Sequence, residues 1–418
     1  MPAPKRRTSL LAVAVSALVA TASVQAGAST PPESSAADSP VTSSPETSTV
    51  VQPRATSTPD ANLTSGVRTR MATSTAHAWS VVVDIAGRGR VVDVAGGTGL
   101  RPASTEKLFT TLPVLINQPN RRLGPFVDPN AVHADLIVRS SGDPTLGGPD
   151  IDRLAKHLHD AGVRKVAGRL VLDIGGLPMD RVRSGWKSSY VPTDVAPLSP
   201  FPIGGDRISS SSTYLSRPTA GNLAFLRARL KNAGVGITGD TVVLRHVDMP
   251  RVFTSHSSAT LASIVKTTLL YSVNFYAEQL LSIEGRAAVT ATSNAAGVTN
   301  TSATDGSGLS LDDVTTTRAE VALLKYSTAS SANSLLRGSL PVACRTGTLE
   351  HDLCATITAG KVAAKTGTLS GVKCLAGYTT DGAGRAVTFA ILTNGDTSTT
   401  KAMAAFQQVL ALVRVYKG

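Results

Sequence analysis

The sequence predicts an α/β (α+β) fold in which helices flank an antiparallel sheet, with a helical subdomain and an inserted α+β module. Strand patterns lie at both ends of the folded part, at residues 80–97 and 361–395. Apolar residues recur at helical spacing in 261–285. Between these regions, residues 125–252 alternate helix and strand patterns, which is typical of a separate mixed module.

The N-terminal segment precedes these elements and has a different composition. A basic triplet at residues 5–7 is followed by an apolar run, Leu10–Val24, and a small-residue cleavage signal, so we expect a signal peptide at 1–26. The run is short for a membrane span, which needs about 20 residues. Cleavage and retention as an anchor both stay open. Residues 27–66 are rich in Ser, Thr and Pro and are expected to form a linker.

Composition narrows the classes of partner. The chain has 418 residues, of which 42% are hydrophobic and 17% charged, as in globular proteins. Aromatic residues make up only 4%, and no long run of lysine and arginine occurs, so we expect no nucleic-acid partner. The formal net charge of +12 favours anionic surfaces, and we expect peripheral association with a membrane or a cell wall.

The first folded elements are a hairpin and a helix. Residues 80–97 alternate apolar and polar side chains around a Gly-Arg-Gly turn at 87–89. A helix then begins near Pro102. Helices ending at glycines follow in the middle module, and residues 401–416 are expected to form a closing amphipathic helix.

A serine and a lysine lie three residues apart where the helix near Pro102 begins. Proline suits the first turn of a helix, and Leu108 and Leu112 continue the apolar face. Residues three apart share one face, so the Ser104 hydroxyl and the Lys107 amine are within reach of each other. The pair predicts a serine nucleophile activated by a lysine base, although an ordinary capped first turn has the same pattern.

Two further motifs follow in a consistent order. Residues 272–274 (Ser-Val-Asn) interrupt a helical pattern, and residues 365–367 (Lys-Thr-Gly) begin a strand. Together with Ser-x-x-Lys they form the motif set of penicillin-binding proteins and class A β-lactamases. Each motif is weak alone, but the three together favour acyl-transfer chemistry.

Acyl transfer needs a nucleophile, a base, a proton route to the leaving amine and donors for the oxyanion. We assign Ser104 as the nucleophile and Lys107 as its base. Ser272 is expected to pass a proton toward the leaving nitrogen. Asn274 is expected to hold the substrate amide.

The third motif is expected to bind the end of the substrate. Lys365 supplies a fixed positive charge, and the hydroxyls of Thr366 and Thr368 bind a terminal carboxylate. Gly367 lets the substrate backbone approach the strand closely. The backbone N–H groups of Ser104 and Thr368 form the oxyanion hole. This chemistry needs no histidine, and we expect neither a metal ion nor a cofactor.

Several longer stretches resemble one protein family. "LRPASTEK", "GWKSSYVPTDVAPLS", "FYAEQLL", "TDGSGLS", "GTLEHDL" and "AAKTGTLSGVKCLAGY" are similar to sequences of the D-alanyl-D-alanine carboxypeptidase/endopeptidase family of low-molecular-mass class C penicillin-binding proteins. The resemblance covers about residues 75–415. It implies the transpeptidase fold shared by penicillin-binding proteins and serine β-lactamases. It also implies a discontinuous catalytic domain at 67–124 and 253–418, with an inserted α+β domain at 125–252.

The resemblance implies a function as well. We expect an exported serine-type D-Ala-D-Ala carboxypeptidase that acts on peptidoglycan stem peptides through an acyl-enzyme on Ser104, with D,D-endopeptidase activity left open. β-Lactams are the expected covalent inhibitors. One alternative is a β-lactamase-related hydrolase, which would need an added glutamate for deacylation. The other is a catalytically weak scaffold that binds peptidoglycan. The sequence departs from the family at Val273, at Leu311 and after Trp186, and the assigned residues are unaffected.

The chain has three cysteines, an odd number that leaves at least one unpaired. Cys344 and Cys354 flank a short loop, and export permits oxidation, so we expect them to form a disulfide. Cys374 follows the Lys-Thr-Gly motif in a strand pattern. We expect it to be a buried free thiol.

Overall fold

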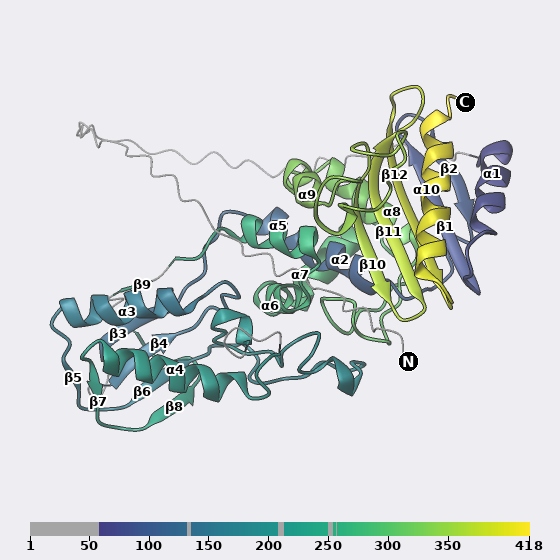
Figure 1. Cartoon of the computed structure of the whole chain (residues 1–418). Coiled ribbons are helices and arrows are strands. Elements are labelled where there is room, and N and C mark those ends of the chain that lie inside the picture. The colour runs from purple at the N-terminus through teal and green to yellow at the C-terminus, as the bar shows by residue number, and fades with distance from the viewer. Residues whose placement is uncertain (1–57, 132–134, 208–212, 250–253, 256) are drawn as a thin grey trace, which may run out of the picture. The chain divides into compact units, whose positions relative to one another are not determined.

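The computed structural model describes residues 58–418, apart from 132–134, 208–212, 250–253 and 256 (Figure 1). The expected signal peptide and most of the expected linker lie outside the described residues. Within the described part, no helix is long and apolar enough to cross a membrane.

A five-stranded sheet brings the two ends of the folded chain together. Its strand order is β10-β11-β12-β1-β2, and every neighbouring pair is antiparallel. The strands are β1 (Ala78–Ile85), β2 (Gly89–Val94), β10 (Ala363–Leu369), β11 (Val372–Thr380) and β12 (Ala386–Asn394). Because β1 pairs with β12, the early hairpin completes the late three-stranded section. The predicted antiparallel sheet is confirmed.

Alternation along the strands divides the side chains between two cores. Val81 and Val83 of β1 join the core under helices α1 (Ala61–Met71) and α10 (Thr399–Val415), whereas Val82 faces the opposite core. Polar side chains cap both helices, since Asp60 accepts from the backbone nitrogen of Leu63 and Ser398 from that of Lys401. These caps fix where each helix begins.

The linker expected at 27–66 ends earlier than the sequence indicated. Helix α1 begins at Ala61, and it buries Leu63, Val67 and Met71 at four-residue spacing. Those three residues form one apolar stripe that packs against the core of the sheet. In a flexible linker the same side chains would be exposed to water.

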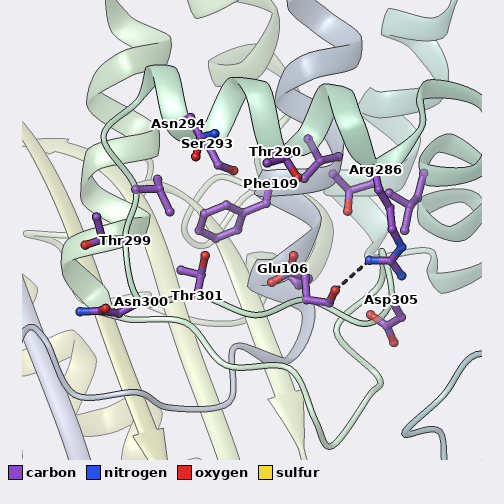
Figure 2. Close-up of a pocket in the computed structure, with 15 residues that line it drawn as sticks. Glu106, Phe109, Arg286, Thr290, Ser293, Asn294, Thr299, Asn300, Thr301 and Asp305 are labelled. Carbon is purple, nitrogen blue, oxygen red and sulfur yellow. Dashed lines mark hydrogen bonds between the residues drawn. The ribbon is translucent and has the colours of Figure 1, made fainter.

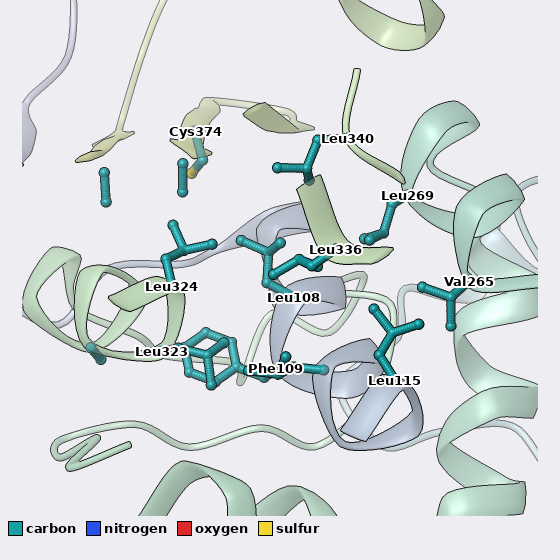
Figure 3. Packing of buried hydrophobic residues seen from close by; sticks show 14 of the residues in the cluster. Leu108, Phe109, Leu115, Val265, Leu269, Leu323, Leu324, Leu336, Leu340 and Cys374 are labelled. Atoms are coloured by element: carbon teal, nitrogen blue, oxygen red, sulfur yellow. The ribbon is translucent and has the colours of Figure 1, made fainter. Parts of the chain in front are cut away.

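The opposite face of the sheet packs on a helical layer. Its members are α2 (Lys107–Asn117), α5 (Leu261–Tyr271), α6 (Asn274–Glu284), α7 (Arg286–Ala295), α8 (Thr317–Thr328) and α9 (Asn333–Ser339). Figure 3 shows leucines of α2, α8 and α9 converging below Cys374 of β11. Leu108, Leu112 and Leu115 are almost fully buried there, so α2 is anchored by its apolar face. This anchoring fixes the position of the turn that precedes α2.

The middle of the chain builds a second sheet. The strand order is β8-β6-β4-β3-β9, with parallel pairs between β4, β6 and β8 and antiparallel pairs at β3. Its strands are β3 (Phe126–Ala131), β4 (Asp135–Arg139), β6 (Leu170–Asp173), β8 (Thr241–Leu244) and β9 (Thr254–Ser255), and β5 (Lys165–Val166) pairs with β7 (Gly236–Ile237).

Two crossover helices connect the parallel strands of the second sheet. Helix α3 (Gly148–Asp160) lies between β4 and β6 in sequence, and α4 (Pro218–Asn232) lies between β6 and β8. Ile151 and Leu226 of these helices join one core with Leu136 and Leu170 of the sheet. The helix-then-strand repeat in the sequence therefore forms parallel crossover units. The domain boundaries at 124/125 and 252/253 stay a prediction. Strand β9 pairs with β3, so the second sheet includes residues up to Ser255.

Candidate active site

Ser104 lies in a tight turn that leads into helix α2. The turn is a 3-10 segment, Ala103–Glu106, and Ala103 has a φ of 47°, which is uncommon for a residue other than glycine. A second loop presses on this turn, because a Cβ at Gly308 would lie 1.8 Å from the Ala103 carbonyl oxygen. The backbone is therefore strained at Ala103, the residue immediately before Ser104.

Lys107 is completely buried and has three hydrogen-bond partners. Its Nζ lies 2.9 Å from the Ser104 Oγ, 2.9 Å from the Asn274 Oδ1 and 2.6 Å from the carbonyl oxygen of Ser307. The structure therefore brings the first and second motifs to one atom. The partner at Ser307 was not expected from the sequence.

The protonation of Lys107 follows from this environment. Burial lowers the pKa of its amine to about 8, although nearby carboxylates oppose the shift. A neutral amine has two N–H bonds and one lone pair. The oxygens of Asn274 and Ser307 accept the two N–H bonds, so the lone pair is left for the hydroxyl of Ser104. This is the arrangement that a lysine base requires.

The second motif lies at the junction of two helices. Ser272 has φ 58° and ψ 40°, a left-handed conformation that ends α5, and Asn274 begins α6. The junction turns both side chains toward the site. Ser272 Oγ accepts from Lys365 Nζ at 2.9 Å, and Asn274 Nδ2 donates to the carbonyl of Asp194 at 3.4 Å.

Lys365 lies in a buried environment that bears on the fixed positive charge expected from the sequence. It is 0% exposed, and its Nζ donates to Ser272 Oγ and to the carbonyl of Thr366 at 2.7 Å. Burial lowers the pKa of Lys365 well below its usual range, and the nearby Lys107 lowers it further. Burial therefore disfavours the charged form, and the fixed positive charge expected at Lys365 stays a prediction.

The remaining residues of the third motif also have partners that the sequence did not reveal. The Thr366 hydroxyl lies 2.7 Å from that of Thr348. Thr368 is exposed at the end of β10, and its hydroxyl accepts from Lys373 Nζ at 3.0 Å. Lys373 is thus a further cation beside the motif.

Gly367 packs against the segment before Ser104, a contact that the sequence did not reveal. A Cβ at this position would lie 2.7 Å from the carbonyl oxygen of Pro102. Strand β10 therefore lies directly against the segment that precedes Ser104. This packing requires a residue without a side chain, independently of any contact with substrate. The close contact supports the prediction that the backbone nitrogens of Ser104 and Thr368 act on one oxyanion.

Glu278 lies outside the three sequence motifs. It is completely buried on α6, and its Oε1 accepts from the backbone nitrogens of Gly306 (2.8 Å) and Ser307 (2.9 Å). Its Oε2 accepts from Arg183 Nε at 2.9 Å. Glu278 thus holds the loop whose Ser307 carbonyl binds Lys107.

Asp305 organises the same loop from within. Its carboxylate accepts from the backbone nitrogens of Ser307, Gly308 and Ser310 at 2.7 to 3.0 Å. Trp186 of the middle module donates its indole N–H to Asp305 at 2.7 Å. Glu278 and Asp305 lie within "FYAEQLL" and "TDGSGLS". The family resemblance pointed to these stretches, but it did not indicate a role for either carboxylate.

A cavity of about 300 Å³ lies beside Glu106, at the end of the 3-10 turn, and Phe109 of α2 (Figure 2). Glu106 is only 3% exposed, and burial raises the pKa of its carboxyl well above the usual range. Phe109 forms another part of the wall, and Arg286 donates to the carbonyl of Ala303 at 2.7 Å at the edge. Burial therefore disfavours the charged form of Glu106, the residue that precedes Lys107.

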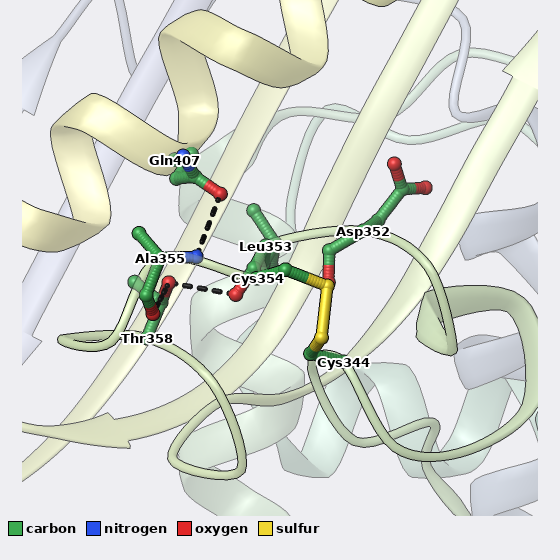
Figure 4. The surroundings of a disulfide bond; sticks show 7 residues. All are labelled: Cys344, Asp352, Leu353, Cys354, Ala355, Thr358 and Gln407. Carbon is green, nitrogen blue, oxygen red and sulfur yellow. Dashed lines mark hydrogen bonds between the residues drawn. A yellow bond between two sulfur atoms is a disulfide. The ribbon is translucent and has the colours of Figure 1, made fainter.

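A disulfide lies close to the third motif. Cys344 and Cys354 are joined, with their Cα atoms 4.8 Å apart, and Cys374 is a buried free thiol (Figure 4). This is the pairing expected from the sequence. The closed loop carries Thr348, which meets Thr366. In the described part of the chain, no group of three or more His, Cys, Asp and Glu residues is placed to hold a metal ion.

Known proteins resemble this chain in sequence and in fold. The chain is 25% identical over 419 residues to a D-alanyl-D-alanine carboxypeptidase from Actinomadura sp. (strain R39), covering 75% of this chain and 77% of that protein. It is 27% identical over 352 residues to "Carboxypeptidase DacB" from Mycolicibacterium smegmatis, covering 73% and 76%. Its fold matches penicillin binding protein 4 (dacB) from Haemophilus influenzae with a TM-score of 0.72 and 20% identity, covering 82% and 97%.

The family match extends over almost the whole described chain. The model of the D-Ala-D-Ala carboxypeptidase 3 (S13) family matches residues 63–216 and 208–414, which include the first sheet, the middle module and all three motifs. The chain therefore belongs to the D-Ala-D-Ala carboxypeptidase 3 (S13) family and is a serine-type carboxypeptidase.

Proposed function

We propose that this peptidoglycan peptidase removes the terminal D-alanine of stem peptides through an acyl-enzyme on Ser104. The observation that carries the proposal is the 2.9 Å contact between Ser104 Oγ and Lys107 Nζ, combined with the lowered pKa of Lys107, about 8. A buried, largely preorganised base next to a hydroxyl is the arrangement that serine acylation needs.

Acylation begins with proton transfer from Ser104 to Lys107. The Ser104 oxygen then bonds to the carbonyl carbon of the penultimate D-alanine. The backbone N–H groups of Ser104 and Thr368 stabilise the resulting oxyanion. Asn274 keeps Lys107 in place and orients the substrate amide.

The leaving group departs with a proton. The terminal carboxylate binds near Thr368 and Lys373, and its negative charge raises the proton affinity of Lys365. The bound carboxylate thereby favours the charged form of Lys365. The C–N bond breaks as the Ser272 hydroxyl gives its proton to the leaving nitrogen and takes one from Lys365. Thr366 is expected to assist at the carboxylate together with Thr348.

Hydrolysis restores the enzyme. Water adds to the acyl carbonyl and its proton returns through Ser272 to Lys365, while the Ser104 oxygen leaves with the proton that Lys107 held. A β-lactam enters the same path, because its strained amide takes the place of the peptide bond. We propose that the β-lactam ester is hydrolysed slowly and that the chain is exported to the cell envelope, where its substrate lies.

Release of D-alanine from a soluble stem peptide tests this function. We expect turnover by the purified protein and none by Ser104→Ala, with an unchanged thermal unfolding profile for the variant. Absence of D-alanine release by the wild-type protein, with penicillin labelling retained, would favour the scaffold alternative. A penicilloyl-enzyme that turns over in seconds would favour the β-lactamase-related alternative. A crosslinked dimeric peptide in the same assay measures endopeptidase activity.

A further inference from the structure

A second cavity, of about 610 Å³, opens beside α6 and is separate from the catalytic lysines. We call it the arginine pocket. Its ten lining residues include four arginines and no acidic residue. The arginines are Arg181, Arg183, Arg245 and Arg286. We infer that the arginine pocket binds the phosphodiester groups of an anionic polymer.

The charge of the pocket is only partly neutralised by the protein. Arg183 is paired with the buried Glu278, so it contributes little free charge. In the part of the chain that the structure describes, the other three arginines form no ion pair. Asp180, which adjoins the pocket in sequence, instead accepts from the backbone and hydroxyl of Thr219. Among the described residues, these three guanidinium groups therefore line one cavity without an ion pair, although Arg286 interacts electrostatically with the nearby Glu106.

Backbone carbonyls hold two of these side chains in place without cancelling their charge. Arg245 Nη1 donates to the carbonyls of Gly175 (2.8 Å) and Leu177 (3.1 Å). Arg286 donates to the carbonyls of residues 303–304, and Figure 2 shows its side chain at the border of the neighbouring cavity. A guanidinium has five N–H bonds, so each arginine keeps donors for a ligand.

The chemistry of the donors indicates the ligand class. Guanidinium groups match the oxygens of a phosphate in a two-pronged geometry, and several of them together favour repeated phosphates over one small ion. Met179 is 51% exposed in the pocket wall, and Val182 nearby is 49% exposed, so apolar contact with the carbon backbone of a polymer is available. The site is concave, whereas a bilayer needs a projecting surface, which favours a chain over a lipid membrane.

The test uses the full-length protein and soluble poly(glycerol phosphate) as the probe. The charge-reversal variant Arg181→Glu/Arg245→Glu removes two free guanidinium groups from the pocket. Its matched control is Arg164→Glu/Lys165→Glu, which makes the same charge change at exposed positions of the middle module outside the pocket. Calorimetry measures affinity at several salt concentrations, and hydrolysis of a short stem peptide checks that the catalytic site is intact.

We expect the wild-type protein and the control to bind the polymer with similar, salt-sensitive affinity. The pocket variant should bind about tenfold more weakly or worse, since each lost contact is charge-assisted, and its peptide hydrolysis should be unchanged. No binding by the wild-type protein would overturn the inference, and so would equal weakening in both variants. Binding to phosphatidylglycerol vesicles but not to the polymer would overturn it in favour of a lipid surface.

Discussion

The carboxylate of Glu278 accepts a hydrogen bond from the backbone nitrogen of Ser307 at 2.9 Å, and the carbonyl oxygen of Ser307 lies 2.6 Å from Lys107 Nζ. Glu278 also accepts from Arg183, so Arg183 is connected to Lys107 through the Glu278 carboxylate and the backbone of Ser307. Glu278 is therefore a positioning residue that acts on Lys107 through a loop.

Replacing Glu278 with glutamine should test this connection. A glutamine has one oxygen, so it cannot accept from both Arg183 and the loop nitrogens. We expect a loss of about 3 kcal/mol in the free energy of unfolding, because a buried ion pair is broken. We also expect kcat/KM to fall and its acidic limb to move to lower pH, because the carboxylate raises the pKa of Lys107.

Glu284→Gln is the matched control for this change. It lies on the same helix, but Glu284 accepts from Asn117 and from Gln118 at the surface, away from the base. The control should retain stability, activity and the pH profile. If Glu278→Gln lowers stability without moving the acidic limb, Glu278 supports the fold and does not tune the base.

The pH dependence of the wild-type enzyme follows from the lowered pKa of Lys107, about 8. The active form is the neutral amine, so protonation removes activity as the pH falls. We expect kcat/KM to fall about tenfold for each pH unit well below 8 and to level off above it. Stopped assays on a stem peptide whose own groups do not titrate there would measure this limb. A flat profile between pH 6 and 9 would contradict the role of Lys107.

The sequence was sufficient to predict the fold class and many of its elements, and the catalytic roles assigned to its motifs stay predictions. Ser104 and Lys107 are close because a three-residue spacing on a helix start leaves little freedom. The motif order indicated that Asn274, Ser272 and Lys365 belong to one site, but the contacts Lys107–Asn274 and Ser272–Lys365 were not predicted. The antiparallel strands and the closing helix followed from alternation and apolar spacing.

Other features depended on tertiary packing and were missed. The lowered pKa of Lys365 arises from burial and from the nearby Lys107, and spacing carries no information about burial. Gly367 is required by the carbonyl of Pro102, 265 positions earlier in the chain, which a single sequence does not reveal. Nothing in the sequence distinguishes Glu278 and Asp305 from other acidic residues. Both bind the backbone of the loop that contacts Lys107, and this contact exists only in the folded chain.

We expect two lysines, Lys365 and Lys373, to contribute to binding of the substrate carboxylate. Lys365→Ala and Lys373→Ala should each lower kcat/KM more for a peptide with a free C-terminus than for its C-terminal amide. A charge-assisted contact contributes about 1.5–3 kcal/mol, so the loss should be about tenfold or more. Lys365→Ala should also lower kcat on the amide, because Ser272 loses its partner. Equal losses on both substrates in both variants would contradict carboxylate binding.

The disulfide should stabilise the loop that supports the third motif. Cys344→Ser/Cys354→Ser opens a loop with a sequence separation of 10, which corresponds to about 2–3 kcal/mol in the loop-entropy model. We expect a lower Tm and a lower kcat/KM, because the loop carries Thr348. Thr348→Val is the control that removes only the hydroxyl contact with Thr366. It should lower kcat/KM with little change in Tm. An unchanged Tm in the cysteine variant would show that the bridge does not contribute.

Mapping the covalent adduct formed with a β-lactam tests the central claim most directly. The full-length protein is incubated with penicillin, digested without reduction and examined by mass spectrometry, beside Ser104→Ala and Lys107→Ala. We predict one penicilloyl group on Ser104 in the wild-type protein, none in Ser104→Ala and strongly slowed labelling in Lys107→Ala. An adduct on another residue, or labelling at an unchanged rate without Lys107, would contradict the account of a serine nucleophile activated by a buried lysine.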